Sequence, residues 1–242
     1  EKKAVEKKSA GFLPLLGKAW SRYSFIFVFI VILIVYAITI HLNGNTFKWS
    51  HITAILASQN TVIVGTMAIG MALIIITGQI DLSIGSTAVI VGALSTIVYN
   101  ANGSIVLSIL TAIAAGALCG TINGVLVGKA KMPPFVATLG TMMIYRSIAE
   151  YFVFKIDVNL TGSSYKYQFS TAYESAKILK YIGTGKINVG SFAIPIVAII
   201  FIFFVLLMIF VTKCTKYGKQ VYAVGSNEKS ARLAGVNVDW IK

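Results

Sequence analysis

The sequence predicts an all-α integral membrane protein, a polytopic helix bundle with about six transmembrane spans of roughly 20 residues each. Of its 242 residues, 57% are hydrophobic and 12% are charged, about half the charged fraction of a soluble domain. Long apolar runs alternate with short polar segments that hold most lysines and arginines. The spans are expected at residues 24–42, 52–76, 84–99, 104–127, 135–154 and 191–212.

Basic residues predict the orientation of these spans. Three segments that would share one side carry fourteen lysines and arginines: the tail 1–23, the connection 129–131 and the segment 213–242. The other side, which includes the loop 155–190, carries six. Because cytoplasmic segments are enriched in Lys and Arg, we expect a cytoplasmic N-terminus, a transmembrane domain over 24–212 and an external loop at 155–190.

Several classes of protein are disfavoured. The net charge of +13 would suit nucleic acid only on a basic face of a soluble domain. Two cysteines and two histidines show no metal-site spacing, so no metal and no bound cofactor are expected. There is no G-x-x-x-x-G-K-[ST] for ATP, no HExxH, no paired intramembrane carboxylates and no Ser–Lys or Ser–His arrangement. The protein is therefore predicted not to be an enzyme.

A polar break at Thr77–Ser86 interrupts the apolar sequence between the second and third spans. Asp81 is the only charged residue between Ile52 and Val98. Gly78 and Gly85 allow the chain to leave the helical conformation and return to it. Two readings remain open: a polar turn that joins two helices, and a discontinuous helix that lines a polar path.

Other polar side chains lie within the apolar runs and are candidates for lining such a path. Gln59 and Asn60 occur near the start of the second span, and Asn123 occurs near the end of the fourth. Together with Asp81 and Ser83 they are the candidate path residues, because the hydroxyl groups of a polar solute need hydrogen-bond partners.

The fourth span has a small residue at every fourth position. Gly116, Gly120, Gly124 and Gly128 continue a series that begins with Ser108. Residues four apart share one helix face, and glycine there lets another backbone come close. The stripe is predicted to be a helix-packing seam and not a ligand site.

The segment after the sixth span has the signals of a short helix. Asn227 is a helix N-cap candidate, and Gly235 suits the position just past a helix that ends at Ala234. Glu228 and Arg232 are four apart in the favourable order. Ala231 and Ala234 are expected to be exposed and to suit a partner's groove. An ordinary cytoplasmic loop is the alternative.

Four sequence blocks resemble, in the same order, the permease subunit of bacterial ABC importers for monosaccharides, the ribose/galactose/xylose branch. They are Ile76–Ser86; Asn123–Val125 with Lys131–Thr141; Arg146; and Thr215–Asn227 with Ala231–Val238. Gln79 stands where the family more usually has glycine. The family's permeases continue through further helices, so the resemblance implies that this chain, which stops at Lys242, is part of a longer protein.

The resemblance implies a subunit of the bacterial inner membrane that forms a translocation path with a second permease copy, identical or paralogous. Its other partners would be an ATP-binding cassette subunit, which holds ATP and Mg²⁺, an extracytoplasmic sugar-binding protein and membrane lipid, with no nucleic acid. The implied ATPase-coupling residues are Gly218, Tyr222, Gly225, Asn227, Glu228, Ala231, Arg232 and Gly235. The alternative is a stand-alone secondary transporter of a small polar solute, for which only Asp81, Arg146 and Glu150 offer charged relays.

Overall fold

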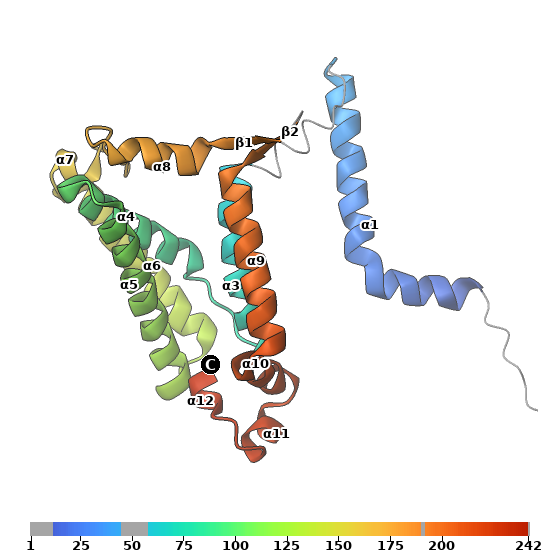
Figure 1. The fold of residues 1–242 in the computed structure, drawn as a ribbon. Helices are drawn as coiled ribbons and strands as arrows, with labels where there is room; N and C mark the ends of the chain where they lie inside the picture. Colours follow the sequence, from blue (N-terminus) through green and yellow to red (C-terminus); the bar gives the residue numbers. More distant parts are fainter. Residues whose placement is uncertain (1–11, 45–57, 190–191, 242) are drawn as a thin grey trace, which may run out of the picture. The chain divides into compact units, whose positions relative to one another are not determined.

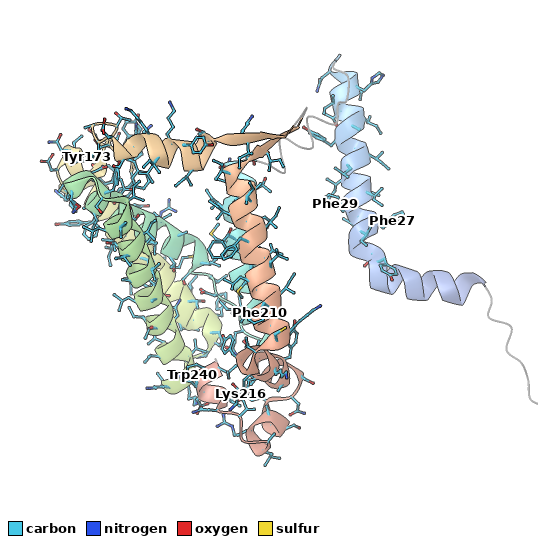
Figure 2. All side chains as sticks on the ribbon, viewed as in Figure 1. Phe27, Phe29, Tyr173, Phe210, Lys216 and Trp240 are labelled. Atoms are coloured by element: carbon cyan, nitrogen blue, oxygen red, sulfur yellow. The ribbon has the colours of Figure 1, made fainter. Side chains whose placement is uncertain are left out.

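The computed structural model describes residues 12–44, 58–189 and 192–241, which fall into two compact units divided after Ile55. The described part of the first unit is the helix α1 (Phe12–Leu42) and the turn that follows it, shown in blue in Figure 1. It begins well before the predicted start of the span at residue 24, so part of the predicted tail 1–23 is helical. Its apolar side chains, such as Phe27 and Phe29 in Figure 2, are exposed within this unit.

The second unit is almost wholly helical (Figure 1). Its elements are α3 (Gln59–Ile76), α4 (Ile84–Asn102), α5 (Ile105–Gly124), the π-helical turn η1 (Val125–Lys129), α6 (Pro134–Lys155), α7 (Val158–Thr161), α8 (Ser175–Thr184), β1 (Lys186–Val189), β2 (Phe192–Pro195), α9 (Ile196–Cys214), α10 (Lys216–Ser226), α11 (Glu228–Leu233) and α12 (Val238–Ile241).

Each predicted span overlaps a helix over most of its described length, although residues 52–57 lie outside the described residues. Within the described part, three helices are long and apolar enough to cross a membrane: Ile84–Asn102, Ile105–Lys129 and Ile196–Cys214. The count of six spans stays a prediction.

A short antiparallel hairpin is the element that the all-α prediction missed. β1 pairs with β2 from Lys186 opposite Pro195 to Val189 opposite Phe192. Branched and aromatic residues flank Gly190–Ser191 in the sequence, a pattern typical of a hairpin. Because β2 occupies residues 192–195, the last apolar helix begins at Ile196 and not at the predicted residue 191.

The core of the second unit lies among α4, α5 and α6. Ile90, Ala93, Cys119, Tyr145 and Ala149 form one buried cluster. The Tyr145 hydroxyl donates to the Cys119 carbonyl at 3.1 Å, which joins α6 to α5. The buried phenol is thereby satisfied in an apolar environment, where an unpaired hydroxyl would be costly.

The helix α9 has an apolar surface that the described chain leaves uncovered. None of its described side chains is buried, and Phe203, Leu206 and Phe210 are exposed (Figure 2 labels Phe210). One side of α9 packs on α3, where a Cβ at Gly65 would come within 2.8 Å of the Phe201 ring. Exposed apolar surface of this extent is typical of a helix that faces lipid or another subunit.

A buried asparagine at the end of α4 holds the long loop in place. Asn100 Nδ2 donates to the carbonyls of Leu160 (2.9 Å) and Gln168 (3.0 Å), and Asn100 Oδ1 accepts from Ser170 N at 2.7 Å. The Tyr173 hydroxyl donates to the Asn100 carbonyl at 2.8 Å. One side chain therefore satisfies three backbone groups of a loop that has little regular structure.

Replacing this side chain should loosen the loop. Asn100→Ala leaves three backbone groups without their partner, and each unsatisfied buried group costs about 1–3 kcal/mol of unfolding free energy. We expect a lower thermal midpoint in detergent and faster proteolysis within residues 160–173. The matched control is Asn102→Ala, at an exposed position of the same helix. Equal stability and equal cleavage in the two variants would contradict this role.

Candidate functional site

The predicted break between the second and third spans is present as a non-helical stretch, residues 77–83, between α3 and α4. Gly78 has a φ of +77°, in the left-handed region that glycine adopts without a steric penalty. Gly78 N donates to the Ile75 carbonyl (2.9 Å) and Gln79 N to the Ile74 carbonyl (3.1 Å). This pairing ends a helix while satisfying its last carbonyls.

Asp81 organises the chain after the break. Ser83 N and Ser83 Oγ each donate to Asp81 Oδ1 at 2.7 Å. Asn123 Nδ2, from α5, donates to Ser83 Oγ at 2.8 Å. Ser83 is completely buried and Asn123 is 8% exposed. The structure thus brings three of the five candidate path residues into one hydrogen-bonded chain.

Thr138 of α6 makes a further hydrogen bond to the break. Leu82 N donates to Thr138 Oγ1 at 3.2 Å, and Thr138 Oγ1 donates to the Pro134 carbonyl at 2.8 Å. An unpaired backbone amide away from water costs free energy comparable to a lost hydrogen bond, so the contact with Thr138 stabilises the irregular backbone. Thr138 was not among the candidate residues, although it lies inside the block Lys131–Thr141.

A cavity of about 230 Å³ lies beside the break. It is lined by Leu73, Ile74, Thr77, Gln79, Ile80, Asp81, Gly120, Asn123, Gly124, Val127, Pro134, Thr138, Tyr217, Val221 and Ile241. Asp81 therefore accepts the hydrogen bonds of a turn, and it also lines this cavity together with mostly apolar residues. That the break lines a polar path stays a prediction.

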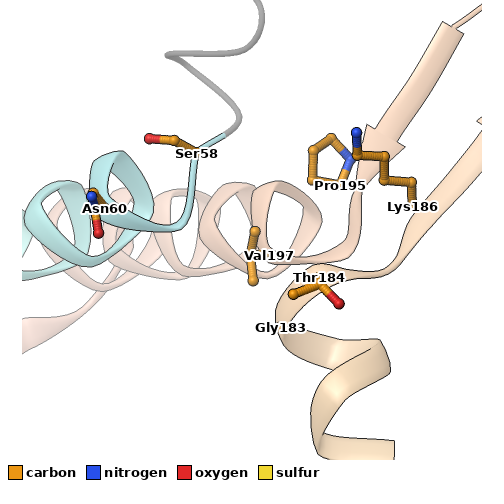
Figure 3. Close-up of a pocket in the computed structure, with 7 residues that line it drawn as sticks. All are labelled: Ser58, Asn60, Gly183, Thr184, Lys186, Pro195 and Val197. Carbon is orange, nitrogen blue, oxygen red and sulfur yellow. The ribbon is translucent and has the colours of Figure 1, made fainter.

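Asn60 lies apart from this group. It lines a second cavity of about 340 Å³ with Ser58, Gly183, Thr184, Lys186, Pro195 and Val197, shown in Figure 3. This cavity lies between the start of α3, the end of α8 and the hairpin. The side chain of Gln59 lies outside the described residues. Both remain candidate path residues by prediction alone.

The first half of the small-residue stripe of α5 packs against α4, and the glycines that follow face a cavity. In its first half, the hydroxyls of Ser95 and Ser108 lie 2.7 Å apart across α4 and α5, and a Cβ at Gly116 would sit 3.8 Å from Val91. Cβ atoms at Gly120 and Gly124 would meet nothing within 4 Å, and both glycines line the 230 Å³ cavity.

Gly128 is buried in η1. Among the described residues, close helix packing is seen along the first part of the stripe. For Gly120 and Gly124, close packing against another helix stays a prediction, because no described helix lies against them.

The segment after α9 folds into three short helices, and two of its predicted caps are present. Asn227 Oδ1 accepts from Ser230 N at 2.9 Å at the start of α11. Gly235 has a φ of +79° just past the end of α11. The predicted pair also forms, with Arg232 Nη2 at 3.6 Å from Glu228 Oε1.

The exposure predicted for Ala231 is wrong. Its side chain is 4% exposed and packs in a cluster with Val221, Val224, Val238 and Ile241. The reason is that α12 folds back against α10 and α11 and buries one face of α11. The predicted exposure of Ala234 is confirmed, and Leu233 beside it is 91% exposed.

The other implied coupling residues lie on α10. Tyr222 is exposed and Gly218 is buried. Gly225 makes the closest approach to another helix, because a Cβ there would lie 1.8 Å from the Ile76 carbonyl oxygen at the end of α3. Only glycine fits such an approach of one backbone to another. The end of α3 is also where the break begins.

A charged bridge joins α12 to the connection before α6. Asp239 Oδ1 accepts from Lys131 Nζ and from Arg232 Nη2, the latter at 3.0 Å. Lys131 and then Arg232 lower the pKa of the Asp239 carboxyl to about 2. Lys131 has a φ of +57°, which non-glycine residues rarely adopt. The bridge therefore helps to hold an unfavourable backbone conformation next to the cavity.

No group of His, Cys, Asp and Glu residues in the described part of the chain is suited to a metal ion. What the site offers is hydrogen-bonding groups inside a helix bundle with an apolar exterior. That combination is typical of a helical membrane protein. Residues 51–242 match the family described as the permease component of the branched-chain amino acid transport system, and the chain belongs to this family.

Similar proteins include permeases named for three different sugars. The ribose import permease protein of Escherichia coli K12 is 32% identical over 213 residues, which are 88% of this chain and 61% of the relative. The fructose import permease protein of Rhizobium meliloti is 31% identical over 210 residues (86% and 55%). The galactofuranose transporter permease protein of E. coli K12 is 33% identical over 174 residues (72% and 46%).

These relatives confirm the resemblance to monosaccharide importer permeases, which are transport subunits and not enzymes. The chain spans about 61% of the length of the ribose permease. No solved structure matches it.

Removing the charge of Asp239 should free α12 and the connection before α6 together. In Asp239→Asn we expect faster amide hydrogen exchange over residues 236–241 and 131–132, because two cations lose one shared anion. The control is Glu174→Gln, a carboxylate-to-amide change at a fully solvated position. Faster exchange at 236–241 alone would contradict a bridge between the two segments.

The same bridge predicts a pH dependence. A carboxyl whose pKa is lowered on folding stabilises the fold above its unfolded pKa, here 3.8, and loses that effect as the pH falls through its folded pKa of about 2. Protection factors in the two segments should therefore stay constant from about pH 5 to pH 9 and fall only in strong acid. A loss of protection near pH 6 would contradict Asp239 as the group responsible.

Proposed function

We propose that this chain is the permease subunit of an ATP-driven monosaccharide importer, which forms the translocation path and is driven by a separate ATPase subunit. The names of the relatives support sugar import. The single observation that carries the coupling is the contact between Gly225 and the Ile76 carbonyl, which links the cytoplasmic helices to the break.

In this proposal the protein is a multi-pass protein of the bacterial inner membrane with a cytoplasmic N-terminus and six spans, as the basic residues predict. Its partners are an ATP-binding cassette subunit with ATP and Mg²⁺, a second permease copy and an extracytoplasmic sugar-binding protein. The exposed apolar surface of α9, with Phe203, Leu206 and Phe210, is available to lipid or to the second copy.

The three short helices α10, α11 and α12 pack together and are expected to move as a rigid unit. Val221, Val224, Ala231, Val238 and Ile241 form a cluster of their own, against which Leu73 and Ile76 of α3 pack. A force on α11 is therefore passed through this cluster to the end of α3. Two packed elements in contact transmit displacement because protein interiors are close-packed and resist compression.

The ATPase would contact the outer surface of this rigid unit. Leu233 at the tip of α11 is 91% exposed, and Trp240 on α12 is 73% exposed. Large apolar side chains exposed at the tip of short polar helices are typical of a docking site. Coupling requires that the ATPase holds this surface differently in its nucleotide-bound and nucleotide-free states.

The alternative, a secondary transporter, lacks support from the charged residues. Arg146 Nε donates to Glu150 Oε1 at 2.7 Å on one exposed face of α6, so these two charges neutralise each other. Asp81 is engaged by Ser83. No continuous relay of ionisable groups connects them among the described residues, and ion-coupled transport needs such groups.

The contact at Gly225 can be tested by adding one methyl group. Gly225→Ala forces α10 away from Ile76, at a cost of about 1–3 kcal/mol for an overpacked contact. We expect ATP-driven uptake to fall at least tenfold in the reconstituted complex, with membrane insertion and ATPase association unchanged. Gly140→Ala is the control, because nothing lies within 4 Å of its Cβ position. Full uptake by Gly225→Ala would contradict coupling through this contact.

The docking surface can be tested at Leu233. Leu233→Asp keeps the buried cluster intact but places a charge where an apolar anchor would be desolvated, so ATPase co-purification should be lost. Asn102→Asp adds the same charge at the opposite end of the helices and should leave it unchanged. Normal co-purification of Leu233→Asp would show that α11 is not the docking element.

A further inference from the structure

The amide orientation of Asn123 follows from the number of protons available to its partners. The Ser83 hydroxyl has one proton, and it donates that proton to the Asp81 carboxylate. Towards Asn123 the hydroxyl can therefore only accept, so the Asn123 group that faces it must be the Nδ2 donor. The amide oxygen, Asn123 Oδ1, is left on the other side of the side chain.

This oxygen is buried and has no hydrogen-bond partner in the described part of the chain. Asn123 lines the 230 Å³ cavity and is more than nine-tenths buried. Gln79 lines the same cavity, and its Oε1 is the other buried side-chain acceptor without a partner. Leaving such a group unsatisfied costs about as much as a lost hydrogen bond, so two such acceptors on one cavity call for donors there, either water or a solute that displaces it.

The other lining residues limit what that ligand is. Asp81 contributes a negative charge, and no lysine, arginine or histidine occurs among the described residues that line the cavity. A carboxylate or phosphate ligand would be repelled and would find no cation. The volume of about 230 Å³ lies below the roughly 300–1,000 Å³ of sites for drug-sized ligands, which limits the ligand to a small molecule.

We propose that Gln79 Oε1 and Asn123 Oδ1 accept hydrogen bonds from two hydroxyl groups of a small, neutral, polyhydroxylated solute bound in this cavity. The inference rests on the proposed function, because the solute is the one that travels the path. It makes Gln79 a specificity-determining residue, and it excludes amino acids, whose carboxylate the cavity does not match.

The cytoplasmic helices form part of the wall of this site. Tyr217 and Val221 of α10 and Ile241 of α12 line the cavity. Any displacement of α10 and α12 therefore changes the cavity itself, in addition to the end of α3. The proposed solute site therefore includes residues of the segment 213–242, on which the ATPase is proposed to act. The affinity for the solute should then differ between the states that the ATPase imposes.

The test is direct binding to the complete transporter, permease and ATPase together, in nanodiscs without the external binding protein. Equilibrium dialysis with radiolabelled D-ribose, D-fructose and D-galactose measures affinity for Gln79→Met, which keeps the side-chain volume and removes the acceptor. Gln79→Glu retains an acceptor at the same position. Gln168→Met is the matched control, since the same change occurs at an exposed residue of the loop.

We expect the wild type and Gln168→Met to bind at least one of these sugars equally. Gln79→Met should bind it roughly tenfold more weakly, the loss expected for one hydrogen bond, and Gln79→Glu should bind it more tightly than Gln79→Met. Leucine and sugar phosphates should not compete.

Unchanged affinity in Gln79→Met, or competition by leucine, would overturn the inference. Binding of sodium ions in place of every sugar would overturn it too. ATP-driven uptake of the bound sugar is measured on the same preparation. If the wild type transports a sugar and Gln79→Met binds it normally, only the Gln79 assignment fails. If the wild type transports none of the sugars, the proposed function fails as well.

Discussion

Everything around the site depends on a single hydrogen-bonded chain, in which Asn123 donates to Ser83 and Ser83 donates to Asp81. In a membrane, irregular backbone is tolerated only where its polar groups find partners inside the protein. This chain, together with Thr138 at the Leu82 amide, provides those partners and allows α3 and α4 to be separate helices. Without it the break would lose its fixed geometry, and the cavity beside it would lose its polar wall.

The second constraint is the close approach of α10 to the end of α3. The charged bridge at Asp239 ties the same group of helices to the connection before α6, so the body formed by α10, α11 and α12 is attached to both sides of the cavity. In the proposed function, residues 213–242 couple to the ATPase and the cavity binds the solute. Tyr217, Val221 and Ile241 line that cavity, so in this proposal a displacement of α10 and α12 changes the solute site directly.

The sequence predicted most of the features that a local pattern decides, although it did not lead to the β1–β2 hairpin. The apolar runs predicted the helices, Gly78 and Asp81 predicted the break, and Asn227 and Gly235 predicted the ends of α11. The burial of Ala231, the charge bridge at Asp239 and the contact of Gly225 with Ile76 were not predictable in this way. Each depends on how segments far apart in the sequence pack together. From the sequence, Gln79 is only a departure from the family's usual glycine. That its Oε1 is buried beside the cavity, without a partner among the described residues, depends on the tertiary structure.

The most direct test of the account measures whether the break and the cytoplasmic helices respond together. Amide hydrogen exchange is compared in the assembled transporter with and without a non-hydrolysable ATP analogue. We expect nucleotide to change the exchange rates at residues 79–83 and at residues 221–226 in parallel, because the contact between Gly225 and Ile76 joins the two segments. A change confined to residues 221–241, with the amides of residues 79–83 unaffected, would contradict it.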